Sequence, residues 1–144
     1  LDLHVLIGRV LGVLGDDPQN ERATTEFTRG ADDPSVVADP QQVEQVLFNL
    51  LLNAYQATEY RGCVRVSTSG GEDEVRVRVE DDGPGIPDDV RNQMFEPFFT
   101  TRAKGTGLGL AIVRKIVDGH GGSIDVESEP GRGTRVTVSL PRES

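Results

Sequence analysis

Apolar positions recur along the chain with two different spacings, and these divide it into helices and strands. Steps of three and four residues are typical of amphipathic helices and predict them over 3–14, 40–60 and 107–118. Alternation of apolar and polar residues predicts strands around 25–29, 35–38, 64–69, 74–81, 123–127 and 134–140. A further short helix is predicted near 88–94, within an otherwise irregular stretch.

Turn and cap residues separate these elements. Asp39-Pro40 has the residue types of a helix N-cap and first helical position, and Gly119 is predicted to end the third long helix. Gly70-Gly71 lies between two alternating segments and predicts a hairpin. A helix followed by mixed strands and helices predicts an α+β fold. We expect a two-layer sandwich, with a mixed, mostly antiparallel sheet covered on one face by about three helices.

Composition narrows the class of protein. The 144 residues suffice for a single domain, 1–144, with a core, and the net charge of −9 argues against a nucleic-acid partner. Cys63 is the only cysteine, which leaves no disulfide and fits a reducing cytoplasm. No apolar run reaches the roughly 18 residues of a membrane span. The only methionine is Met94, so Leu1 is not expected to be a natural start, and we expect a domain of a longer protein. We expect this domain to be cytoplasmic and to make no membrane contact.

Two asparagines stand out on the second predicted helix. Gln45, Asn49 and Asn53 are spaced by four residues and form one polar stripe beside a leucine-rich face. Asparagine is a mediocre helix former, so such a pair calls for a partner. The amides could hydrogen-bond a neighbouring loop inside the core. Alternatively, their oxygens could face a cleft and ligate a hard cation such as Mg²⁺.

A carboxylate ends the strand 74–81. Asp81 is followed by a turn through Gly83 and Gly85. A carboxylate only accepts hydrogen bonds, so in a cleft Asp81 would select N–H donors, such as the amine of adenine, and disfavour the carbonyl of guanine. The two glycines would let the backbone approach a flat ring closely. An ordinary strand-to-loop turn uses the same residue types.

Three glycines alternate in GTGLGL (105–110) at the start of the third long helix. The string matches neither the P-loop pattern nor the dinucleotide-binding fingerprint. Free N–H groups at a helix N-terminus favour a phosphate, and Arg102 and Lys104 just upstream could add positive charge. These two basic residues could equally belong to a solvated loop.

Six blocks occur in a fixed order: NLLLNA (49–54), DDGPGI (81–86), FEPFF (95–99), GTGLGL (105–110), GHGG (119–122) and PGRGT (130–134). In this order and spacing they resemble the catalytic ATP-binding domain of bacterial sensor histidine kinases. That domain belongs to the superfamily of gyrase, heat-shock chaperone, histidine kinase and mismatch-repair ATPases, with the Bergerat fold. The stretch FEPFFTTRAKGTGLGL is most similar to the nitrogen-regulation type of kinase.

The resemblance implies ATP and Mg²⁺ as cofactors and assigns roles to residues. Asn53 would ligate Mg²⁺ and Asn49 would line the same site, which makes them the catalytic pair. Asp81 would read adenine, with Gly83 and Gly85 beneath the ring and Thr134 supporting the same edge. Residues from about 87 to 106 would form the ATP lid, anchored by Phe95, Phe98 and Phe99. The other implied nucleotide contacts are Ile86, Phe99, Arg102, Lys104, Gly105, Thr106, Gly107, Leu108, Gly109 and Leu110.

Two positions depart from the superfamily pattern. Asn49 stands where the hydrolytic branches carry a glutamate that activates water, and an amide cannot take that proton. Rapid ATP hydrolysis is therefore disfavoured. Gln56 stands where many sensor kinases have a lysine, so one phosphate contact is missing unless Arg102 or Lys104 replaces it.

The family's phosphoacceptor histidine sits on a separate dimerisation domain. His4 and His120 are the only histidines, and neither has the acidic neighbour of that motif. We therefore expect Mg-ATP binding without self-phosphorylation, a monomeric fragment, and two partners: the dimerisation domain of the same kinase and a response regulator. A conformational ATPase, a non-catalytic nucleotide sensor and a protein-serine kinase of the anti-sigma kind are the alternatives.

Overall fold

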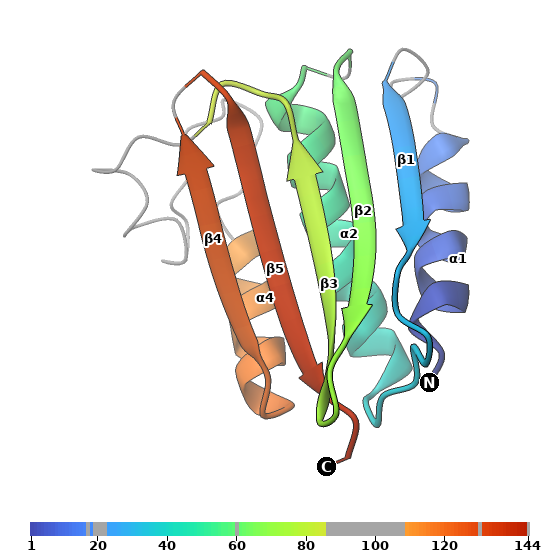
Figure 1. The fold of residues 1–144 in the computed structure, drawn as a ribbon. Helices are drawn as coiled ribbons and strands as arrows, with labels where there is room; N and C mark the ends of the chain where they lie inside the picture. Colours follow the sequence, from blue (N-terminus) through green and yellow to red (C-terminus); the bar gives the residue numbers. More distant parts are fainter. Residues whose placement is uncertain (17, 19–22, 60, 86–108, 130, 144) are drawn as a thin grey trace.

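A computed structural model describes residues 1–16, 18, 23–59, 61–85, 109–129 and 131–143. One five-stranded sheet is covered on one face by the three described helices (Figure 1). The helices are α1 (Leu3–Gly15), α2 (Pro40–Ala57) and α4 (Gly109–Gly119). The strands are β1 (Thr24–Arg29), β2 (Cys63–Gly70), β3 (Glu74–Asp81), β4 (Ser123–Glu129) and β5 (Gly133–Pro141). The predicted α+β sandwich is confirmed.

The strand order is β1-β2-β3-β5-β4. Parallel pairing joins β1 to β2, with α2 between them in the chain, and the other three pairs are antiparallel. The predicted hairpin is confirmed: β2 and β3 are joined at Gly71, whose N–H donates to the carbonyl of Glu74 at 2.8 Å. The sheet is therefore mostly antiparallel, as expected.

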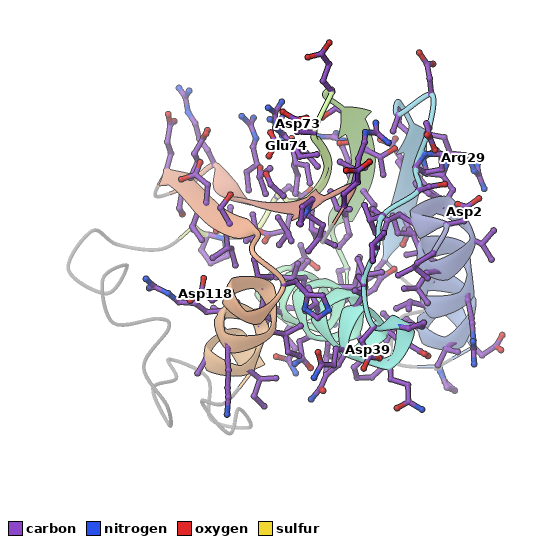
Figure 2. All side chains as sticks on the ribbon, turned by 90° about the horizontal axis from the view of Figure 1, so that it is seen from below. Asp2, Arg29, Asp39, Asp73, Glu74 and Asp118 are labelled. Carbon is purple, nitrogen blue, oxygen red and sulfur yellow. The ribbon has the colours of Figure 1, made fainter. Side chains whose placement is uncertain are left out.

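The core lies between the sheet and the helices. Strand residues of one parity are mostly valines that point toward the helix layer, and the helices contribute leucine, isoleucine and valine. Figure 2, viewed from below, shows these two layers, with charged residues such as Asp118 and Glu74 among the labelled side chains. Each fully buried side chain of this size stabilises the fold by about 1.5–3 kcal/mol relative to exposure. The largest are Leu3, Ile7, Leu47, Leu51, Val10, Val43, Val64, Val66, Val75, Val77, Val113 and Val117.

The helix starts follow the predicted cap chemistry. Asp39 is the N-cap of α2, with Pro40 in the first turn, and its Oδ1 accepts from the backbone N–H of Gln41 at 2.9 Å. Asp2 caps α1 in the same way, because its Oδ1 accepts from the N–H of His4 at 2.8 Å. A carboxylate at this position satisfies backbone donors that the helix cannot.

Two helix ends differ from the prediction. The second helix was predicted to reach residue 60 but ends at Ala57, because Glu59 takes a left-handed conformation with φ of 56°. Gly119 was predicted to stop the third helix but is its last helical residue. The left-handed residue that ends it is Gly121, with φ of 73°, which suits a residue without Cβ.

The strand predicted at 35–38 does not form. Ser35 makes one isolated bridge with Asp2, and Leu1 and Val36 exchange backbone hydrogen bonds of 3.2 and 3.0 Å. The segment pairs only with the first residues of the chain, so no longer ladder develops.

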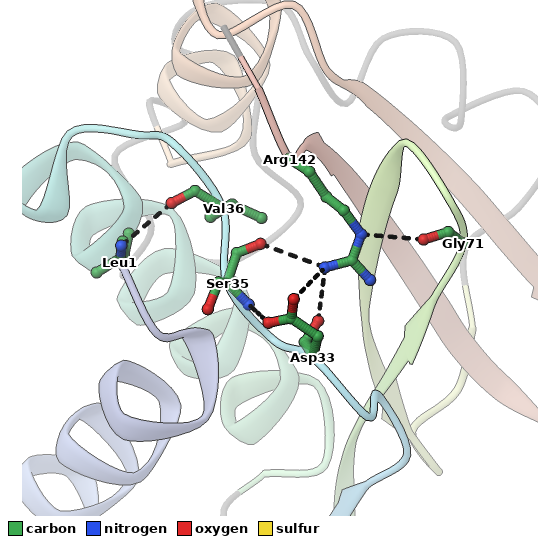
Figure 3. A network of polar contacts seen from close by, with 6 residues as sticks. All are labelled: Leu1, Asp33, Ser35, Val36, Gly71 and Arg142. Carbon is green, nitrogen blue, oxygen red and sulfur yellow. Dashed lines mark hydrogen bonds and ion pairs between the residues drawn. The ribbon is translucent and has the colours of Figure 1, made fainter.

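Arg142 joins three segments at one end of the sheet (Figure 3). Its Nε donates to the carbonyl of Gly71 at 3.0 Å, and its Nη1 donates to those of Asp33 at 2.8 Å and Ser35 at 3.4 Å. The Ser35 backbone N–H, assisted by Arg142, lowers the pKa of Asp33. The guanidinium therefore links the C-terminal segment to the β2–β3 turn and to the segment before α2.

Replacing Arg142 with alanine is expected to lower the free energy of unfolding by about 2 kcal/mol, because charged donors to carbonyls contribute more than neutral ones. Arg142→Lys should recover part of this loss, since one ammonium cannot reach all three carbonyls. Urea unfolding followed by circular dichroism measures the change. Arg76→Ala is the control, because Arg76 makes an exposed pair with Glu74 and should cost about 0.5 kcal/mol or less. Equal stability of the two variants would contradict the linking role of Arg142.

The open face of the sheet carries a row of alternating charges, one from each strand. Register pairs Glu26 with Arg65, Arg65 with Glu80, Glu80 with Arg135, and Arg135 with Glu127. Ion pairs of 3.1, 3.0 and 3.3 Å join Arg65 to Glu26, Arg135 to Glu80 and Arg135 to Glu127. The hydrogen bond with Glu26 raises the pKa of Arg65. We call these five residues the charge row.

Candidate functional site

Polar side chains replace valine at one end of the helix-facing side of the sheet. Val79, Val136 and Val126 are register partners on β3, β5 and β4, and all three are buried. The next positions of the same parity are Asp81, Thr134 and Ser128, which are also register partners. Asp81, Thr134 and Ser128 are each half-buried. We call these three residues the polar row. It places Asp81 beside Thr134, the two residues expected to share one edge of a ligand.

The loop after Asp81 is held tightly. Oδ1 of Asp81 accepts from the backbone N–H of Gly83 at 2.9 Å. A Cβ on Gly83 would lie 2.6 Å from the carbonyl oxygen of Ala57, the last residue of α2. Gly85 has φ of 79°, which favours glycine. The close approach that Gly83 permits is therefore to α2, and it joins the end of β3 to the end of that helix.

The β4–β5 turn packs against the backbone of Asp81 and of the loop that follows it. Gly133 has φ of 108°, and a Cβ there would lie 2.0 Å from the carbonyl oxygen of Asp81. The N–H of Gly131 donates to the carbonyl of Pro84 at 2.7 Å. Only glycine fits at residue 133, because any side chain would clash with the backbone of β3. Gly133 belongs to the block PGRGT (130–134), but its sequence pattern alone does not reveal this requirement.

The asparagine stripe lies on the part of α2 that approaches this loop. Asn49 and Asn53 are half-buried, as is Gln56, whereas Gln45 is exposed. Ala57 follows Asn53 by one helical turn, and its carbonyl is the group that Gly83 approaches. The fold thus brings the amides of α2 and the carboxylate of β3 to the same end of the molecule.

The remaining predicted contacts are mostly in the glycine-rich segment. Helix α4 begins at Gly109, and Leu110 is half-buried against the core. The predicted lid, the short helix near 88–94 and the start of the third helix at 107 lie outside the described residues. So do Ile86, Phe95, Phe98, Phe99, Arg102, Lys104, Gly105, Thr106, Gly107 and Leu108.

Both histidines make structural contacts. His4 Nε2 lies 2.7 Å from the Thr68 hydroxyl, as expected for a structural residue. His120 Nδ1 donates to the carbonyl of Ile116 at 2.8 Å, and its Nε2 accepts from the backbone N–H of Asp39 at 3.1 Å. The ring of His120 therefore joins the end of α4 to the start of α2, the helix that carries the asparagines.

The described residues hold no cluster of three or more His, Cys, Asp or Glu that could bind a metal ion. Among the same residues, no helix has both the length and the apolar character to cross a bilayer.

Residues 38–144 match the protein family described as histidine kinase-, DNA gyrase B- and HSP90-like ATPase. The chain belongs to this family. The match begins just before α2 and includes the asparagine stripe, the polar row and the glycine-rich segment.

Relatives narrow the family to sensor histidine kinases. The chain is 42% identical over 141 residues to the sensor histidine kinase ZraS of Escherichia coli K12, covering 98% of this chain and 30% of ZraS. It is 45% identical over 121 residues to the sensory histidine kinase/phosphatase NtrB of Rhodobacter capsulatus, and the match covers 75% of this chain and 34% of NtrB. The similarity to the nitrogen-regulation type is confirmed. The chain spans about 30% of the length of ZraS, as a domain would.

Solved structures agree over nearly the whole chain. The nucleotide-free catalytic domain of histidine kinase ThkA matches with a TM-score of 0.89 and 36% identity, covering 99% of this chain and 96% of that one. ThkA in complex with the response regulator TrrA matches with a TM-score of 0.84 and 34% identity, and the match covers 99% of this chain and 41% of that one. The chain is the ATP-binding catalytic domain of a sensor histidine kinase, so the family and the fold implied by the resemblance are confirmed.

Proposed function

We propose that this catalytic domain, residues 1–144, binds Mg-ATP between α2 and the loop after β3. There it positions the γ-phosphoryl group for transfer to a histidine on a separate dimerisation domain. The observation that supports this is the convergence of Asn53, Asp81 and Thr134 at one end of the fold. Asp81 and Thr134 are register partners, and Gly83 fixes the Asp81 loop one turn from Asn53.

Asn53 would hold Mg²⁺. Its amide oxygen is a hard donor, and a single protein ligand fits an ion that keeps its waters and takes phosphate oxygens as further ligands. When bound, the ion neutralises phosphate charge. Asn49 would line the phosphates, and it cannot accept a proton from water. The site therefore favours transfer over hydrolysis, which argues against a conformational ATPase.

Asp81 and Thr134 would read the adenine edge, with Gly83 and Gly85 beneath the ring. Residues between Arg102 and Leu110 would contact the phosphates. In the transfer step, the bond from the γ-phosphorus to the ADP oxygen breaks while a bond to an imidazole nitrogen forms, and the acceptor domain takes the proton. The catalytic domain contributes position and charge stabilisation.

The parent protein's partners follow from the same chemistry. The relative ThkA was crystallised with its response regulator, and we propose a response regulator for the parent of this chain. We also propose a cytoplasmic location, a monomeric fragment without membrane contact and, from the net charge of −9, no nucleic-acid partner.

The test combines binding with transfer. Calorimetry with ATP, ADP and GTP, each with and without Mg²⁺, should show adenine-selective binding and a Mg²⁺ effect on ATP. A dimerisation domain from a close relative, added with labelled ATP, should then acquire label on histidine. Adenine binding without transfer would favour the nucleotide-sensing alternative, and steady ATP turnover would favour the ATPase. Absence of ATP binding would contradict the proposal.

A further inference from the structure

His120 belongs to the turn after α4, and its ring bonds to a second helix as well as to its own. Nδ1 donates to the carbonyl of Ile116, in the last turn of α4, at 2.8 Å. Nε2 accepts from the backbone N–H of Asp39, the N-cap of α2, at 3.1 Å. A carbonyl only accepts and a backbone N–H only donates, so both bonds have a defined direction. The ring is therefore neutral, with its proton on Nδ1.

The turn that carries His120 is fixed on the sheet. The N–H of Gly122 donates to the carbonyl of Val117 in α4 at 3.0 Å. A Cβ on Gly122 would lie 2.2 Å from the carbonyl oxygen of Ser139 on β5, so the turn lies directly against that strand. The imidazole thus extends from a backbone held by β5, and its bond to Asp39 joins the start of α2 to the same support.

The N–H of Asp39 is a donor that α2 itself does not engage. The first N–H groups of a helix have no carbonyl partner within that helix. In a capping box, a side chain three residues later in the same helix accepts from the N-cap N–H. Here the acceptor is His120, which follows a different helix, while the Asp39 carboxylate accepts from the N–H of Gln41 at 2.9 Å.

This bond joins α2 and α4 at one end and so affects how they are placed at the other. The two helices lie side by side (Figure 1), and the end of α4 meets the start of α2, so they run in opposite directions. At a rise of about 1.5 Å per residue, Asn49 lies about 15 Å along α2 from Asp39. On the same scale, Gly109 at the start of α4 lies about 16 Å from His120. Asn49 and the start of α4 therefore stand at the same level.

We propose that His120 is a positioning residue for phosphoryl transfer: its bond to the Asp39 N–H sets the axial register of α2 against α4. The register places the asparagine stripe level with the start of α4. This rests on the proposed function, in which both groups contact the phosphates. Transfer requires aligned reacting groups, and a displacement of about 1 Å can reduce a rate about a hundredfold. The proposed adenine edge belongs to β3 and β5 and does not depend on this register.

The experiment compares two amide replacements of His120. Glutamine can place its side-chain oxygen near the position of Nε2 and keep the bond to Asp39, whereas asparagine reaches only the position of Nδ1 and loses that bond. His120→Asn is expected to lower transfer to the added acceptor domain about tenfold at saturating ATP, because the phosphates are misaligned. Its affinity for ADP should stay unchanged, and His120→Gln should keep most of the transfer rate.

His4→Ala is the matched control. Its Nε2 lies 2.7 Å from the Thr68 hydroxyl, so His4 also joins a helix to another element, but neither residue belongs to α2 or α4. This variant should lose stability and keep its transfer rate per folded molecule, with the folded fraction taken from circular dichroism. A merely structural role would make His120→Asn behave in the same way.

Nuclear magnetic resonance gives a readout that is independent of the acceptor domain. In weakly alkaline buffer, the ring nitrogens of His120 in the unmodified protein should show a proton on Nδ1 and none on Nε2. The Asp39 amide should exchange with solvent faster in His120→Asn than in His120→Gln, because only glutamine replaces the acceptor.

The outcomes separate the two proposals. Transfer by His120→Asn at the rate of the unmodified protein overturns the role of His120 alone. So does an equal loss in the asparagine and glutamine variants, because the bond to Asp39 would then not decide the rate. Absence of transfer by the unmodified protein overturns the proposed function and, with it, the positioning role.

Discussion

Asn53→Ala is expected to reduce phosphoryl transfer to an added acceptor domain by at least about a hundredfold, because the domain loses its proposed protein ligand for Mg²⁺. Asn53→Asp should also fail, since it places a full negative charge beside the phosphates and changes the ligand field. Transfer is measured as label on the acceptor histidine at saturating ATP. Calorimetry should show that the Mg²⁺ effect on ATP binding disappears while weak adenine binding remains.

Gln45→Ala is the matched control for Asn53. Gln45 lies on the same stripe of α2, two turns earlier, but its side chain is exposed. Its replacement should leave transfer and the Mg²⁺ effect unchanged. Normal transfer by Asn53→Ala would remove the metal assignment, and failure of both variants would point to damage of α2 rather than to loss of a ligand.

Asp81→Asn is expected to weaken ATP binding by roughly tenfold to a hundredfold. The amide has nearly the same shape as the carboxylate but lacks its charge, and a hydrogen bond to a charged acceptor contributes about 1.5–3 kcal/mol. If the oxygen of the new amide keeps the Gly83 N–H, its NH₂ group replaces the second acceptor. Titration calorimetry with ATP and inosine triphosphate should show a greater loss for ATP, because a donor now faces the base.

Asp73→Asn is the control for Asp81. Asp73 is exposed and directly precedes β3, at the end opposite Asp81. The Asp73→Asn substitution therefore makes the same chemical change on the same hairpin, away from the site. It should bind ATP normally. Equal affinity of Asp81→Asn and the unmodified protein would show that the carboxylate does not contact the base.

Local patterns predicted most elements because their causes are local. Cap residues such as Asp39 act within one turn, and alternation shows which strand residues face the core. The ends of helices depend on single backbone conformations. Nothing in the residue type of Glu59 indicates a positive φ, and between Gly119 and Gly121 the pattern cannot decide which glycine takes it.

Contacts between distant segments account for the other differences. The stretch 35–38 has the composition of a strand, but its partners are the first residues of the chain, and only Ser35 forms a bridge. The sequence indicated only that His120 lacks the acidic neighbour of the phosphoacceptor motif. Its bond to the Asp39 N–H, 81 residues away, depends on the packing of α4 beside α2.

Part of the candidate site could be predicted from sequence, because Asp81, Thr134 and the asparagines belong to recognisable blocks. Ser128, whose hydroxyl lies 3.2 Å from that of Thr134, and Gly133 were not identified from the sequence. For Ser128 a signal existed: it shares the parity of Val126, so alternation alone places a hydroxyl on the buried face. The clash that requires glycine at 133 involves the backbone of β3 and emerges only when the strands are paired.

The charge row has a consequence for encounters between molecules. A row of five charges that alternate in sign has the same sign at both ends. Here the outer strands β1 and β4 place a glutamate at each end of the charge row, Glu26 and Glu127. A second molecule that added itself edge to edge, with its row aligned, would bring glutamate against glutamate. Open strand edges invite such growth into fibrils, and like charges oppose it. The same residues that pair neighbouring strands within one sheet thus disfavour edge-to-edge association in this register.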